Sequence, residues 1–113
     1  SAYMPHFRAQ MNCVPGMITE FAFVPVTTTS DMRQNPDVVA KVKKINKIRV
    51  ENSKALVANG EEALEPYTFD YLLLCNKICG ASHYNMQMKI IVETPEEFEK
   101  WIANQQTFAQ VIQ

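Results

Sequence analysis

The sequence predicts a mainly β domain that carries a helical insertion and a helix at its carboxyl-terminal end. Two segments of alternating side chains, residues 68–75 and 86–93, indicate strands, and three prolines in the first 29 residues exclude a long helix there. A length of 113 residues fits one domain, which we place at residues 1–113. The composition, 47% hydrophobic and 20% charged, is typical of a globular chain, and a net charge of −1 offers no basic excess for nucleic acid.

The first part of the chain, residues 1–29, is expected to consist of extended segments. Its prolines punctuate the backbone, and the pair Pro15–Gly16 is a turn signal. Between this turn and Pro25, the run MITEFAFV is rich in aromatic and β-branched residues. Residues 17–24 are therefore predicted to form a largely buried strand.

Residues 34–65 are predicted to be a helical insertion. The sequence Asn-Pro-Asp at 35–37 is a helix start, after which apolar side chains recur at helical spacing. Lysines occupy the other face. Because glutamates follow them closely, we interpret this face as solvated, and not as a nucleic-acid or membrane surface. A second, weaker helix is expected over 53–58, and Asn59–Gly60 is either its stop or the turn of a hairpin.

Two predicted strands bracket a short loop in the last third of the chain. The runs TFDYLLLC and MQMKIIVE both alternate side chains between two faces, which is typical of strands, and the loop between them spans residues 75–84. A capping-box start at Thr94, Pro95 and Glu97 follows, and it predicts a helix over 94–108.

The chemistry of the chain is concentrated in this loop and the first residues after it, the segment CNKICGASHYNM at residues 75–86. Cys75, Cys79, His83 and Met86 are separated by three, three and two positions. Two thiolates, an imidazole and a thioether suit a soft, one-electron metal such as copper. Zinc is the main rival, although its sites usually combine close-spaced ligand pairs from two places in the chain. A disulfide between the two loop cysteines is the other alternative, and it would leave Cys13 unpaired.

The loop resembles the CuA loop of cytochrome c oxidase subunit II, which has the pattern Cys, three residues, Cys, three residues, His, two residues, Met. The upstream segment SAYMPHFRAQMNCVPGM is also similar to that family, as is the terminal helix. This resemblance implies a cupredoxin-like Greek-key β-barrel or sandwich, truncated at its amino-terminal side, in which residues 34–65 are an insertion.

The resemblance also implies roles for six residues around a binuclear copper centre. Cys75 and Cys79 would be bridging thiolates, and His83 an imidazole ligand. Met86 would be the weak axial ligand, and Lys77 would contribute its backbone carbonyl. Lys77 stands where the family usually has Glu, and an ammonium group cannot replace that side chain at the family's magnesium site. Tyr3 falls where the family has an aromatic residue near the point of electron entry.

One ligand of the family's site is expected to be missing. The second histidine of the family immediately precedes the position of Ser1, and His6 is roughly 20 Å of strand away, at about 3.3 Å per residue. Copper is therefore expected to be absent or incomplete in this chain. The transmembrane hairpin and first strands of the family would also precede Ser1, and the open sheet edges predict a homo-oligomer. Cys13 is expected to be a small buried hydrophobic residue, with a free reactive thiol as the alternative.

The implied function is electron transfer in a respiratory haem-copper oxidase. The parent subunit would accept electrons from cytochrome c and pass them to haem a in subunit I, with its domain on the periplasmic, outer side of the bacterial inner membrane. It would belong to an oxidoreductase, while this chain alone is not expected to be catalytic. The alternatives are a metal-free structural domain and the CuA domain of a nitrous oxide reductase. The second cysteine argues against a mononuclear blue-copper site.

Overall fold

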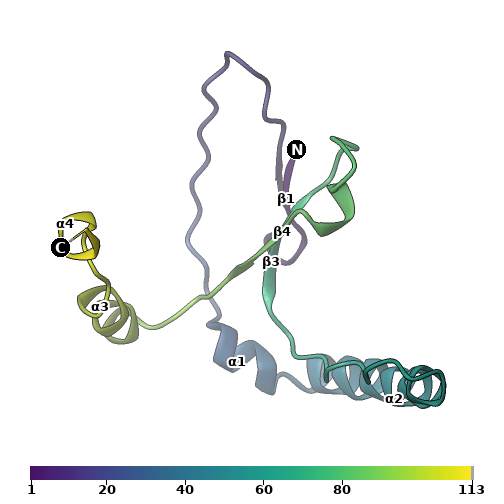
Figure 1. Ribbon diagram of the computed structural model, residues 1–113. Helices are drawn as coiled ribbons and strands as arrows, with labels where there is room; N and C mark the ends of the chain where they lie inside the picture. The colour runs from purple at the N-terminus through teal and green to yellow at the C-terminus, as the bar shows by residue number, and fades with distance from the viewer. Residues whose placement is uncertain (113) are drawn as a thin grey trace.

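A computed structural model describes residues 1–112 and shows a four-stranded antiparallel sheet with helices attached to it (Figure 1). The strands are β1 (Ala2–Met4), β2 (Ala9–Met11), β3 (Tyr71–Cys75) and β4 (Gln87–Ile90), and their order in the sheet is β2-β1-β3-β4. A short 3-10 helix, η1 (Pro5–Phe7), connects β1 to β2. This sheet with helices is consistent with the predicted cupredoxin-like β fold.

The register of the sheet joins the two ends of the sequence. Ala2 lies opposite Cys75 across β1 and β3, and Leu73 lies opposite Met88 across β3 and β4. Both pairings are antiparallel, so residues directly opposite each other present their side chains to the same face. The start of the chain is therefore fixed against the strand that leads into the loop between β3 and β4.

A small aromatic core surrounds Tyr71, which is 2% exposed. The Tyr71 ring lies 4.7 Å from the Phe7 ring and 5.3 Å from the Phe69 ring, measured between centroids. The His6 ring packs against the Phe69 ring at an angle of 85°, with the two centroids 4.9 Å apart. The Tyr71 hydroxyl donates a hydrogen bond to the carbonyl of Thr27 at 3.0 Å. This core lies at the end of β3 opposite to the loop.

Residues 34–65 contain one long helix in place of the two helical segments that the sequence predicts. After α1 (Thr29–Gln34), the side chain of Asn35 caps α2 (Pro36–Ala58), and Gly60 follows its end at a positive φ of 82°. The prediction of a separate helix over 53–58 is wrong. Ser53 does not interrupt the helix, because its hydroxyl accepts a hydrogen bond from the amide of Leu64 and so faces the returning chain.

The prediction of a buried strand over residues 17–24 is also wrong. This segment forms part of the extended loop at the top of Figure 1, and Ile18 and Val24 are 93% and 85% exposed. A strand needs a neighbour for its backbone amides, and none of the residues in 1–112 pairs with this segment. Its contact with the core is made by Phe23, whose ring lies 4.8 Å from that of Phe7.

The helix expected over 94–108 is found as two shorter helices. Thr94 caps α3 (Pro95–Ala103), and its hydroxyl accepts from the amide of Glu97. Thr107 then starts α4 (Phe108–Val111) with a complete capping box. Within residues 1–112 no helix combines the length and the apolar character needed to cross a membrane.

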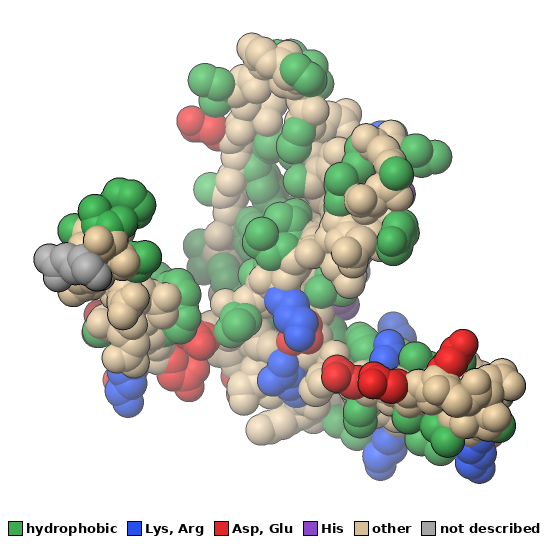
Figure 2. Space-filling model, in the orientation of Figure 1, with side chains coloured by type: hydrophobic (Ala, Val, Ile, Leu, Met, Phe, Trp, Pro, Cys, Tyr) green, Lys and Arg blue, Asp and Glu red, His purple; other side chains and the backbone are tan. Residues whose placement is uncertain are grey.

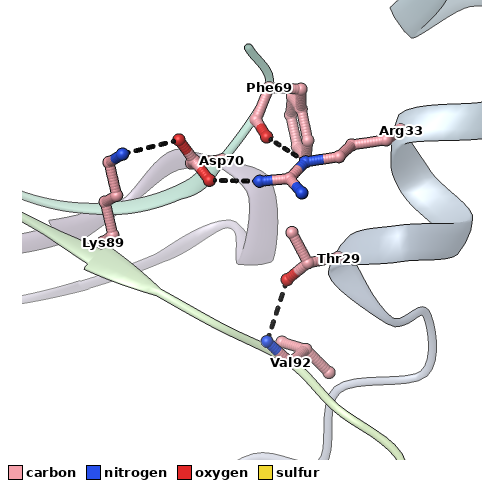
Figure 3. Close-up of polar contacts among 6 residues, drawn as sticks. All are labelled: Thr29, Arg33, Phe69, Asp70, Lys89 and Val92. Carbon is pink, nitrogen blue, oxygen red and sulfur yellow. Dashed lines mark hydrogen bonds and ion pairs between the residues drawn. The ribbon is translucent and has the colours of Figure 1, made fainter.

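An ion-pair group ties helix α1 to the sheet and to the segments beside it (Figure 3). Arg33 donates to Asp70 Oδ1 at 2.7 Å and to the carbonyl of Phe69 at 2.8 Å, and the other Asp70 oxygen lies 3.3 Å from Lys89 Nζ. Thr29, which is buried, accepts from the amide of Val92 at 2.9 Å. These contacts hold α1 against β3 and the segment after β4.

We expect Asp70→Asn to lower the free energy of unfolding by about 1 to 2 kcal/mol, because charge-assisted hydrogen bonds to a mostly buried carboxylate are lost. Urea denaturation followed by circular dichroism measures this change. Glu99→Gln, an exposed carboxylate on α3, is the matched control and should change stability by less than about 0.5 kcal/mol. Equal effects of the two variants would contradict a structural role for Asp70.

Candidate metal centre

The loop between β3 and β4 is fixed at both of its ends by sheet hydrogen bonds. Cys75 is the last residue of β3, and its amide donates to the carbonyl of Met86 at 3.0 Å. The next amide, that of Asn76, donates to the carbonyl of Ser1 at 3.0 Å. Inside the loop, a turn from Gly80 leads into a short 3-10 helix, η2 (His83–Asn85), which brings His83 back toward the cysteines.

Cys79 lies at the centre of the cluster that results. Its Sγ atom is 3.1 Å from Cys75 Sγ, 3.1 Å from Met86 Sδ and 3.6 Å from His83 Nδ1. The carbonyl oxygen of Lys77 lies 3.2 Å from Cys75 Sγ. Potential ligand atoms of the two cysteines and the histidine all lie within 4.8 Å of one another. The structure thus brings together all five groups that the sequence analysis selected as metal ligands.

The donor set fits a soft metal ion. Thiolate and thioether sulfur select copper in its reduced state, and imidazole binds both copper oxidation states. In this structure Cys75 and Cys79 are free thiols. Cys79 is exposed and Cys75 half-buried, so an ion can reach both sulfur atoms from solvent.

The two thiols differ in acidity because they share one hydrogen bond. That hydrogen bond with Cys79 is the largest cause that lowers the pKa of Cys75 to about 7. The same hydrogen bond raises the pKa of Cys79. Cys75 is therefore the thiol of the pair that ionises first as the pH rises toward neutrality, and Cys79 acts as its hydrogen-bond donor.

In the metal-free chain we expect iodoacetamide to alkylate Cys75 faster than Cys79 between pH 6 and 8. The lowered pKa of Cys75 gives it the larger thiolate fraction in this range, and its rate should fall as pH drops below about 7. Peptide mass spectrometry of samples quenched over time measures both rates. Faster labelling of Cys79 at pH 7 would contradict this assignment of the thiolate.

The other residues singled out by the sequence lie outside the cluster. Tyr3 is opposite Leu74 in the sheet, one position out of step with Cys75, and so faces the other side. His6 packs against the aromatic core, and desolvation there lowers its pKa. The expectation that Cys13 is buried is wrong, because Cys13 is exposed: β2 ends at Met11, and no element covers the following turn in the described part of the chain.

Sequence reasoning missed an open cavity of about 320 Å³ beside the cluster. It is lined by Ser1, Ala2, Cys13, Leu73, Leu74, Cys75, Met86, Gln87 and Met88. Alternation along a strand places Met88 on the same face as Met86, and this was the available signal. The position of Cys13 at this cavity depends on the pairing of β1 with both neighbours, which no local pattern specifies.

The chain is similar to two curated proteins. It is 32% identical over 107 residues, 95% of its length, to the alternative cytochrome c oxidase subunit 2 of Bradyrhizobium diazoefficiens. A segment of 39 residues, 34% of the chain, is 41% identical to the cytochrome c oxidase subunit 2 of Thermostichus vulcanus. These matches span 24% and 12% of the two relatives, so the chain corresponds to about a quarter of the first. No protein-family model and no solved structure matches the chain.

Proposed function

Because the chain is homologous to cytochrome c oxidase subunit 2, we propose that it is the part of such a subunit that holds a binuclear copper centre. The observation that carries this proposal is the convergence of two thiols, an imidazole, a thioether and a carbonyl on one loop. A disulfide or zinc site would leave the thioether of Met86 without a role, since zinc is bound mainly by Cys, His and carboxylates.

In this proposal each of the five groups has a role as a ligand. Cys75 and Cys79 supply the thiolates, His83 its Nδ1, Met86 its thioether and Lys77 its backbone carbonyl. The copper, when bound, supplies a one-electron carrier. The pairing of β3 with β4 holds the two ends of the loop, which keeps the ligands in place when the charge of the centre changes.

We further propose that the parent subunit takes electrons from cytochrome c and passes them to haem a in subunit I. Tyr3, beside Leu74 in the sheet, is the proposed entry residue. The parent is then a membrane-associated part of an oxidoreductase, with this domain on the periplasmic side. The chain itself is proposed to carry electrons without turning over a substrate.

The proposed copper centre can be tested by adding a second histidine ligand to the chain. The hydrogen bond from Asn76 to the carbonyl of Ser1 brings the amino-terminal end of the chain beside the loop. One histidine added before Ser1 should therefore reach the cluster. We expect copper to give a purple, valence-delocalised centre in this extended chain, detected by visible absorption and electron paramagnetic resonance. A chain that binds no copper in either form would overturn the proposed function.

Self-association is also proposed, because apolar side chains are exposed in several places. They follow the extended loop and the carboxyl-terminal helices (Figure 2), and include Phe21, Val26, Trp101 and Phe108 at 53%, 97%, 52% and 79% exposure. Strands β2 and β4 are the edges of the sheet. We expect sedimentation velocity to show a concentration-dependent dimer. A monomer at millimolar concentration would contradict this.

A further inference from the structure

We propose that Cys13 and Met88, together with Cys75 and Met86, form a loading site for Cu(I) at the mouth of the metal centre. This inference rests on the proposed function, because it names the residues through which the ion enters the same cluster. Cys13 and Met88 lie outside the loop motif, and the proposal gives both of them a function.

The cavity that these four residues line is rich in sulfur. Four of its nine lining residues carry a sulfur atom, and the others are mostly aliphatic. No acidic side chain lines it, so hard cations such as magnesium or calcium find no carboxylate there. Thiolate and thioether groups in an apolar hollow are the ligands that Cu(I) prefers.

The sheet register explains why these residues line one cavity. The amide of Cys75 donates to the carbonyl of Met86, which places the two residues opposite each other. Met88 lies two residues further along β4 and therefore faces the same side as Met86. Ala2 lies opposite Cys75, and its small side chain leaves space above the sheet. Cys13 lines this space from the turn that follows β2.

The cavity and the metal-binding cluster share two residues. Cys75 and Met86 line the cavity and also contact Cys79, through sulfur–sulfur distances of 3.1 Å in each case. An ion held by Cys13 and Met88 therefore borders ligands of the final site. The exposed positions of Cys13 and of Met88, which is 65% exposed, make them accessible to an incoming copper carrier.

The loading step is an exchange of a proton for a metal ion. The S–H bond of Cys13 breaks, its proton passes to solvent, and an S–Cu bond forms with Cu(I) delivered by a chelator or carrier. The ion then exchanges this bond for one to the thiolate of Cys75, and Cys13 takes a proton back from water. No electron is transferred, so the step needs no oxidant or reductant.

The test measures Cu(I) uptake by the full chain from the bathocuproine disulfonate complex under anaerobic conditions. We expect Cys13→Ser and Met88→Leu each to slow uptake ~10-fold. This is the lower end of the change in metal affinity or activity that follows loss of a residue next to the ligands of a metal site. The amount bound at equilibrium should not change. Met32→Leu, a methionine of α1 outside this cavity, is the matched control and should leave the rate unchanged.

A second measurement separates this inference from the proposed function. In Cys79→Ser, the cluster lacks its central ligand, and one equivalent of Cu(I) should still protect Cys13 from N-ethylmaleimide, as mapped by mass spectrometry. Protection of Cys75 and Cys79 in the original chain, with an unprotected Cys13 and an unchanged uptake rate in Cys13→Ser, overturns the loading site alone. Protection of Cys13 without Cys75 and Cys79 overturns the proposed copper centre and retains a Cys13 site.

Discussion

Cys79→Ser is expected to lower the copper affinity of the chain by more than roughly 100-fold. Loss of a residue that only contacts a metal ligand lowers affinity by roughly 10- to 100-fold, and Cys79 is itself a candidate ligand. The Cys79 sulfur contacts Cys75, His83 and Met86, three of the other candidate ligands. An ion that binds any of these three groups is therefore expected to bind Cys79 as well. A hydroxyl is a hard, weak ligand for copper. Competition with bicinchoninate under anaerobic conditions measures the affinity.

The two histidines provide a matched control for this prediction. His83 lies in the cluster, whereas His6 packs against Phe69 at the other end of the sheet. His83→Asn should weaken copper binding, and His6→Asn should leave it unchanged. Circular dichroism of both variants verifies that the fold is retained. Equal losses in the two variants, or full affinity in Cys79→Ser, would show that copper binds elsewhere.

Tyr71→Ala should unfold most of the sheet. Removing a buried aromatic side chain costs about 3 to 5 kcal/mol, which is a large part of the 5 to about 15 kcal/mol that typically stabilises a domain. Few other side chains are buried in the described residues, so little other packing remains to stabilise the sheet once the Tyr71 ring is removed. Urea denaturation followed by far-ultraviolet circular dichroism measures the free energy of unfolding.

Two further variants separate ring packing from the hydroxyl hydrogen bond. Tyr71→Phe keeps the ring and loses the bond to Thr27, so it should cost about 1 kcal/mol. Tyr84→Ala removes a side chain that is 87% exposed and should cost less than about 0.5 kcal/mol. A Tyr71→Ala chain as stable as Tyr84→Ala would show that the aromatic core does not hold the sheet.

Features that depend on neighbouring residues were predictable from the sequence. The helix starts at Asn35 and Thr94 and the stop at Asn59–Gly60 follow from local capping, and the structure has all three. The candidate ligands lie within one segment of 12 positions, residues 75–86, so their proximity also depends on local turns. Such signals do not require knowledge of the rest of the fold.

Features that depend on distant partners were not predictable. Residues 17–24 have a strand composition, but a strand forms only where another backbone pairs with it, and this segment has none among residues 1–112. Cysteine is a residue type that is usually buried, which led to the prediction for Cys13, but Cys13 is exposed in the structure. The sequence predicted a separate helix beginning at Ser53, but α2 continues through this residue. The amide of Leu64 donates to the serine hydroxyl, so this hydroxyl does not compete with the hydrogen bonds of the helix.

The pairing of Ala2 with Cys75 also constrains the order of folding. β1 is a central strand, yet one of its neighbours lies near residue 75, so the sheet has a long-range contact that slows its formation. During synthesis, β1 has to wait until β3 has left the ribosome, and the loop is closed only when β4 follows it. Strands β1 and β2 are thus held by a later part of the chain, and the ligand cluster can form only after β4 has been synthesised.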